Sequence, residues 1–137
     1  MQSASTSPML KDLFAKHLSE TINHVKRLEN AFHILGIPAE GITCEAMEGI
    51  TKEGDGIIAE TKEGTSTRNV GLILAAQKVE HYEIATYGVL SQIAHLLGLH
   101  DIAGLMEATM DEEKGADKLL SLAASSVIYR QRLRRNN

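Results

Sequence analysis

Residues 68–97 read RNVGLILAAQKVEHYEIATYGVLSQIAHLL. The apolar residues of this stretch recur every three or four positions, which is the period of one face of an α-helix. They are Leu72, Ala76, Val79, Tyr87, Leu90, Ala94 and Leu97. Glu83 falls in the middle of this face, where a helix in a bundle has its core side. The stretch therefore predicts a helix, the longest of the chain, that carries a carboxylate on its buried side.

The same period continues on both sides of this helix. Upstream, residues 7–35 form a long amphipathic stretch in which Pro8 suits the first helical position. A weaker period over residues 44–58 is broken by Gly-Asp-Gly at 54–56, which predicts a short or kinked helix. Downstream, Asp101 is a candidate N-cap for a last helix. Its apolar face carries Ile102, Met106, Leu120, Ala124 and Val127. The pattern predicts an all-α antiparallel bundle of about four helices.

Length and composition fit one domain. Of the 137 residues 43% are apolar and only 4% are aromatic, which favours a helical core over a strand-rich one. We expect the bundle over residues 8–128, between a poorly ordered segment at 1–7 and a basic end at 129–137.

The net charge of −4 makes nucleic acid an unexpected partner, and no apolar run approaches the roughly 20 residues of a membrane span. The single cysteine favours a reducing compartment, hence a cytoplasmic location.

Acidic residues interrupt two of the apolar faces. Glu113 falls in the middle of the face of the last helix, as Glu83 does in the helix before it. Glu80 lies one turn before Glu83, and Asp117 lies one turn after Glu113, so each helix offers two carboxylates to the same region. An ionised carboxylate without a partner in a helical core costs several kcal/mol. These acids must therefore be paired with cations, share a proton or bind metal.

The first long helix offers further ligands. His17 and His24 lie on its apolar face with Thr21, and Glu20 lies at the edge of that face. Carboxylates and imidazoles together suit iron or manganese better than a metal that prefers thiolates. The predicted metal ligands are Glu83, Glu113, Glu80, Asp117, Glu20, His17 and His24. As the alternative, either histidine is a hydrogen-bonded core residue and Glu20 is a surface ion-pair partner.

Six blocks of the sequence resemble the YciF-like ferritin-like family. They are HLSET at 17–21, RLE at 27–29, CEAMEG at 44–49, VEHYEIA at 79–85, YG at 87–88 and DEEKGAD at 111–117. The match runs from about residue 7 to residue 124, and the blocks at 79–85 and 111–117 are the specific ones. The resemblance implies a ferritin-like bundle with a di-iron or di-manganese carboxylate centre, a link to bacterial stress responses and no established reaction.

Family members typically open with a further long helix that carries an acidic ligand. Only seven residues precede Pro8 here, so we expect the equivalent of that helix to be absent. An uncovered groove lined by Leu10, Phe14, Leu72 and Leu90 would follow, and large apolar patches are rare on soluble monomers. We therefore expect a homodimer, in which a second copy covers the groove. The alternative function is a metal-free structural or interaction module whose acidic site is vestigial.

Overall fold

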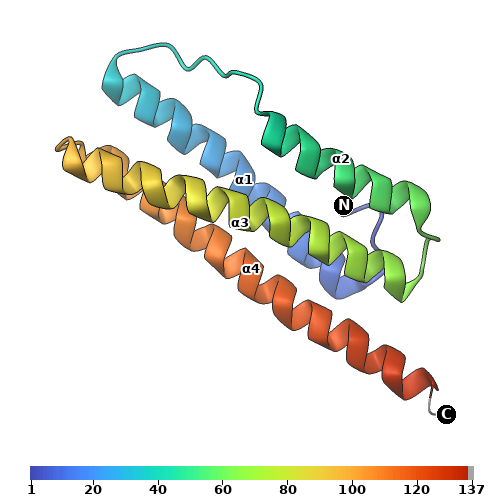
Figure 1. Ribbon diagram of the computed structural model, residues 1–137. Helices are drawn as coiled ribbons and strands as arrows, with labels where there is room; N and C mark the ends of the chain where they lie inside the picture. Colours follow the sequence, from blue (N-terminus) through green and yellow to red (C-terminus); the bar gives the residue numbers. More distant parts are fainter. Residues whose placement is uncertain (136–137) are drawn as a thin grey trace.

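The computed structural model describes the backbone of residues 1–135 and the side chains of residues 1–127. Within that part of the chain the helices are α1 (Pro8–Leu35), α2 (Glu45–Glu60), α3 (Ser66–Leu96) and α4 (His100–Arg135). They run alternately in opposite directions along one long axis, so that α1 and α3 are both antiparallel to α4 (Figure 1). The prediction of an all-α antiparallel bundle is confirmed. The side chains of the basic end at 129–137 lie outside the described residues.

Three helix starts can be compared with the local sequence chemistry. α1 begins at Pro8, as predicted. α3 begins after Thr65, whose Oγ1 accepts a hydrogen bond from the backbone N–H of Arg68 at 3.2 Å. α4 begins at His100, so Asp101 lies in its first turn and is not the N-cap. The carboxylate of Asp101 still lies at the positive end of the helix dipole, which explains the acidic residue at this place.

One prediction about helix length is wrong, and another, of a short or kinked second helix, holds for its length, since α2 with 16 residues is the shortest described helix, but not for the break. The longest helix is α4 with 36 residues, while α3 has 31, because no glycine or proline interrupts the chain between residues 116 and 135. α2 is continuous through residues 54–56, where a break was expected. Gly54 is buried against Ala75 of α3, and a Cβ at Gly71 would lie only 2.6 Å from Ile57 Cγ2. The two glycines thus permit a close approach of α2 to α3, and this packing offsets their low helix propensity.

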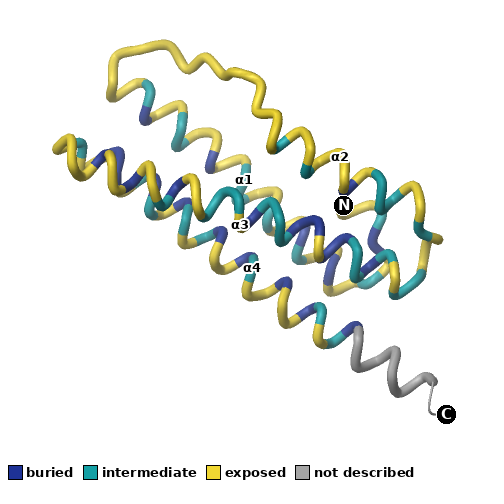
Figure 2. The backbone as a smooth tube through the Cα atoms, viewed as in Figure 1, coloured by how far each residue is buried: buried dark blue, intermediate teal, exposed yellow. Residues whose placement is uncertain are grey.

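Two apolar clusters fill the interior, one towards each end of the bundle. The first contains Leu10, Phe14, Leu72, Ile73, Ala76, Leu120 and Ala123. The second contains Ala31, Tyr87, Ala94, Ile102, Ala103 and Met106. Both combine side chains of α1, α3 and α4, whereas α2 lies on α3 and is exposed along most of its length (Figure 2). None of the described helices is long and apolar enough to cross a membrane.

The groove expected beside Leu10, Phe14 and Leu72 is closed, because all three side chains are buried in the first apolar cluster. The segment before α1 covers this end of the bundle, where Ser5 is fully buried and hydrogen-bonded to α3. Of the expected lining, only Leu90 is exposed. The expectation was wrong because Ala4 and Ser5 of this segment pack against the core. That these residues are poorly ordered in solution stays a prediction.

Candidate metal centre

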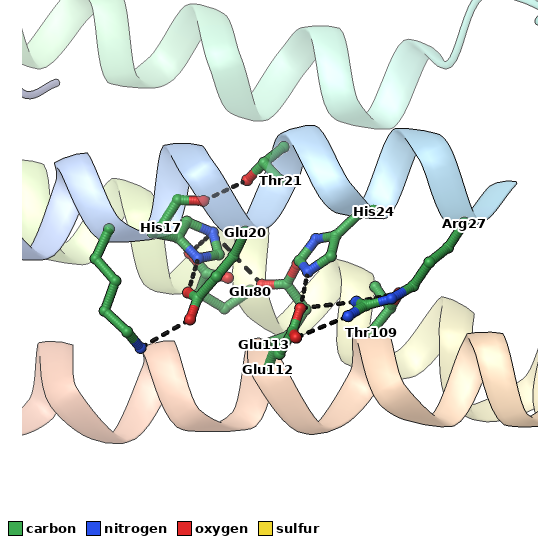
Figure 3. Close-up of polar contacts among 10 residues, drawn as sticks. His17, Glu20, Thr21, His24, Arg27, Glu80, Thr109, Glu112 and Glu113 are labelled. Carbon is green, nitrogen blue, oxygen red and sulfur yellow. Dashed lines mark hydrogen bonds and ion pairs between the residues drawn. The ribbon is translucent and has the colours of Figure 1, made fainter. Parts of the chain in front are cut away.

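Two histidines and two carboxylates meet at the middle of the bundle, between the apolar clusters (Figure 3). His17 and His24 lie two helical turns apart on one face of α1, Glu80 comes from α3 and Glu113 from α4. Glu80 is 1% exposed, Glu113 0% and His24 2%. The helical period thus brings four ionisable groups from three helices into a region with little access for water.

His17 joins the two buried carboxylates. Its Nε2 lies 3.2 Å from Glu80 Oε1 and 3.5 Å from Glu113 Oε2. One ligand atom from each of these three residues lies within 4.8 Å of the other two. On the other side of the ring, Nδ1 lies 3.4 Å from Oε2 of Glu20, whose second oxygen lies 2.7 Å from Lys16 Nζ. Glu20 therefore lies at the rim of the centre, where it contacts His17 and also forms a surface ion pair with Lys16.

His24 is held by an ion pair that was not identified from the sequence. Arg27 donates hydrogen bonds to both carboxylate oxygens of Glu112, at 2.7 Å and 2.8 Å, and a further one to Thr109. Glu112 Oε2 also accepts a hydrogen bond of 2.7 Å from His24 Nε2. Because a carboxylate only accepts, His24 Nε2 carries the proton and Nδ1 of the neutral ring has a free lone pair. That Nδ1 lies 2.8 Å from Glu113 Oε1.

Part of this ion pair has a signal in the sequence. Arg27 follows His24 by three residues, which places both on one face of α1. Glu112 is adjacent to Glu113 and so lies off the apolar face of α4, and its side chain is 34% exposed. The Glu112 side chain reaches Arg27 because α1 and α4 pack closely. The apolar period of α4 alone does not predict this contact.

Four buried atoms at this centre have no hydrogen-bond partner among the described residues. They are His24 Nδ1, Glu80 Oε2 and both carboxylate oxygens of Glu113. Nitrogen and oxygen lone pairs that face one another repel unless a proton or a cation lies between them. Ligand atoms about 2.1 Å from an octahedral divalent ion lie about 3.0 Å apart, and the contacts here measure between 2.8 and 3.5 Å. The residues present therefore fit a divalent ion such as iron or manganese.

Burial also changes the proton affinity of these groups. Burial, followed by the neighbouring Glu80 carboxyl, raises the pKa of Glu113 to about 10. The pKa of His17 is raised as well: burial alone would lower it, but hydrogen bonds and charges of the neighbouring carboxylates outweigh burial. At the rim, hydrogen bonds from Arg27 lower the pKa of Glu112 to about 2. In the absence of metal, the raised pKa favours the protonated form of Glu113.

Glu83 is beside the centre and not in the middle of it. Glu80 has the central position on α3, and Glu83 is half-buried at the edge of the buried face. The buried face of α3 is turned from the expected direction, because Leu90 of the expected face is exposed while its neighbour Ser91 is buried. Glu83 lines a cavity of about 160 Å³ together with His17. Burial at this place raises the pKa of the Glu83 carboxyl.

Asp117 does not join the other predicted ligands. It lies one turn after Glu113, but its Oδ1 accepts a hydrogen bond of 2.9 Å from Gln77 Nε2 and lies 3.3 Å from Nε2 of the exposed His81. These partners belong to the outer seam between α3 and α4. A step of four residues turns a helix by about 40° beyond one full turn, which is enough to carry this side chain out of the centre.

Three comparisons relate the chain to known proteins. A family model described as a domain of unknown function (DUF892) matches residues 1–133. Protein YciF of Escherichia coli (strain K12) is 39% identical over 126 residues, which cover 90% of this chain and 75% of YciF. The crystal structure of the E. coli stress protein YciF is similar with a TM-score of 0.87 and 36% identity, covering 93% of this chain and 80% of that chain.

A second solved structure is that of YcfI from Rhodopseudomonas palustris, which is provisionally described as a structural protein. It is similar with a TM-score of 0.83 and 35% identity, and the match covers 88% of this chain and 76% of that one. The likeness thus extends over most of each protein.

Proposed function

The chain belongs to the DUF892 family, and from this membership and the chemistry of the centre we propose that it is a ferritin-like metal-binding protein linked to the bacterial stress response. The observation that carries the proposal is the group of buried atoms without hydrogen-bond partners on His24, Glu80 and Glu113. Buried polar atoms in native proteins almost always have a partner. A cation bound among them would supply it.

Glu113 would be the ligand shared between two ions. Its Oε2 faces His17, which also contacts Glu80, and its Oε1 faces His24. In di-iron bundles, glutamates and histidines from facing helices hold two ions in the core. We assign His17, Glu80 and Glu113 to one ion and His24 with Glu113 to the second. Glu83 would be a further metal ligand on the side of His17 that faces the cavity.

The chain itself would orient the ligands and handle a proton. The Arg27–Glu112 ion pair holds His24 Nε2–H and thereby turns Nδ1 towards Glu113. Because Glu113 has a raised pKa, its carboxyl would have to release a proton when a cation binds. The apolar clusters on both sides exclude water. Bound iron or manganese would supply Lewis-acid and redox chemistry towards oxygen or peroxide.

Thermal unfolding with added metal tests this function. A ligand that binds only the folded state stabilises it by about 2.7 kcal/mol at 100 times its Kd, which corresponds to a rise in Tm of about 10 °C for a domain of this size. We expect this rise with iron(II) or manganese(II), and we expect Glu80→Gln to abolish it. Glu29→Gln, at an exposed position of α1, is the matched control and keeps the rise. An unchanged melting curve at millimolar metal contradicts the function.

The second candidate function is a metal-free structural or interaction module with a vestigial site. A specific feature favours it: the Arg27–Glu112–His24 contacts and a protonated Glu113 neutralise the centre without an ion. The description of YcfI as a structural protein also favours this second candidate. Elemental analysis of protein purified without chelator separates the two functions, since only the first predicts iron or manganese in the wild type and its loss in Glu80→Gln.

We also propose that two copies of the chain form a homodimer through the outer face of α1. Leu18, Ile22 and Val25 follow one another at helical spacing and are 56%, 51% and 51% exposed. A two-fold axis along this face would bury the same apolar residues of both copies. Light scattering should give a dimer mass that Ile22→Glu reduces to a monomer, while Asn30→Glu leaves it unchanged. A monomer mass of the wild type at every concentration contradicts the dimer.

A cytoplasmic location of the protein stays a prediction.

A further inference from the structure

A separate pair of histidines lies at the end of the bundle where α3 turns into α4. His95 is in the last turn of α3, and His100 is the first residue of α4. Gly98 in the link between them has a φ of 73°, a value that few residues other than glycine adopt readily. The tight reversal of the chain brings the two imidazole rings together, with centroids 5.7 Å apart and planes tilted by 47°.

A carboxylate sets the proton position of one of these rings. Glu107 of α4 accepts a hydrogen bond of 2.8 Å from His95 Nε2. Since the carboxylate has no proton to donate, Nε2 of His95 carries the hydrogen and Nδ1 of the neutral ring has a free lone pair. That Nδ1 lies 3.4 Å from Nδ1 of His100. Two imidazole nitrogens therefore face each other across the turn.

We propose that His95 and His100 form a surface zinc site at the α3–α4 turn. In a tetrahedral zinc site with Zn–N distances of about 2.0–2.1 Å, two ligand nitrogens lie about 3.4 Å apart. The two Nδ1 atoms have this separation, which is long for a hydrogen bond. Histidines that bind metal usually donate their other ring N–H to a carboxylate, as His95 does to Glu107. Water completes the coordination, because the side chains of His95 and Glu107 are 48% and 46% exposed.

This site is independent of the proposed central metal centre. His95 follows Glu80 by 15 residues on the same helix, which is about 22 Å along the helix axis. The two sites share no residue. Zinc at the turn links the end of α3 to the start of α4 on the outside of the bundle, whatever the central site holds.

Zinc titration of the full chain without a polyhistidine tag tests the site. The imidazole proton signals of His95 and His100 are followed by NMR in protein with labelled histidine. We expect both signals to shift together with a single apparent Kd, and we expect His100→Ala to weaken the response of His95 at least tenfold. His33→Ala, at an exposed position in the last turn of α1, is the matched control and leaves the titration unchanged.

Glu107→Gln provides a second variant that keeps both histidines. Loss of a carboxylate that orients a ligand typically weakens metal binding by about 10- to 100-fold, and we expect a loss in this range. The central centre is monitored in the same spectra through His17 and His24, so failure at one site is distinguishable from failure at the other. The site is excluded if the two signals respond with different affinities, if neither responds, or if His100→Ala binds as the wild type does.

Discussion

The central site and the turn site use the same kinds of residues in opposite surroundings. In the middle of the bundle, Glu80 and Glu113 are 1% and 0% exposed, and three of their four carboxylate oxygens have no hydrogen-bond partner among the described residues. At the turn, Glu107 is 46% exposed and its carboxylate orients His95. Burial penalises the charged form of a carboxyl group. A histidine–carboxylate pair in the core therefore needs a proton or a cation to neutralise the carboxylate. At the surface, water solvates the carboxylate, and neither is needed.

The largest expected difference between the sites concerns pH. Without metal, Glu113 has a pKa of about 10 in the folded state against an ordinary value of 4.5. The folded state then binds a proton that the unfolded state has lost, so the free energy of unfolding falls as pH rises from about 4.5 to about 10. In urea denaturation at pH 8 with chelator, Glu113→Gln should raise the free energy of unfolding by roughly 1–3 kcal/mol and flatten this slope.

Glu107→Gln at the turn is the control for this comparison. An exposed substitution of this kind should change the free energy of unfolding by less than about 0.5 kcal/mol and leave its pH dependence as in the wild type. If Glu113→Gln retains the slope of the wild type, burial of Glu113 does not govern the pH dependence.

A smaller effect is expected when the ion pair beside His24 is removed. Arg27→Met leaves Glu112 without the donors that hold it against the ring. The affinity of the centre for manganese(II), measured by electron paramagnetic resonance, should fall by about 10- to 100-fold, or about 1.4–2.8 kcal/mol. Zinc binding at the turn should stay unchanged in the same variant. An unaltered manganese affinity would show that His24 is positioned without Glu112.

The smallest effect is expected from a change in the turn itself. Gly98→Ala places a Cβ at a φ of 73° and should lower the free energy of unfolding by about 1 kcal/mol. Zinc binding at the turn should weaken, whereas manganese binding at the centre should not. Gly104→Ala is the control, because Gly104 lies within α4 with no atom within 4 Å of an added Cβ. This substitution should stabilise the helix by about 0.5–1 kcal/mol. Equal effects of both substitutions would contradict the role of Gly98.

The helices and the acidic, histidine-containing centre of the bundle could be predicted from the residue pattern alone. Apolar residues at a period of 3.6 place a side chain on the inner or outer face of its own helix, so Glu113, His17 and His24 were identified without a structure. Helix propensity and hydrophobic period are local properties of the chain. The presence of buried acids that need neutralisation follows from them directly.

Which side chains meet could not be predicted, because it depends on how the helices pack against one another. The rotation of α3 about its axis depends on its neighbours, and it puts Glu80 in the place expected for Glu83. The contact of Glu112 with Arg27 depends on the packing of α1 against α4, because Glu112 lies off the apolar face of its helix. Likewise, His95 and His100 meet because α3 and α4 reverse direction at one glycine. Periodicity gives a side chain's direction from its own helix, but contacts between helices depend on axial rotation and distance, which arise from packing of the whole bundle.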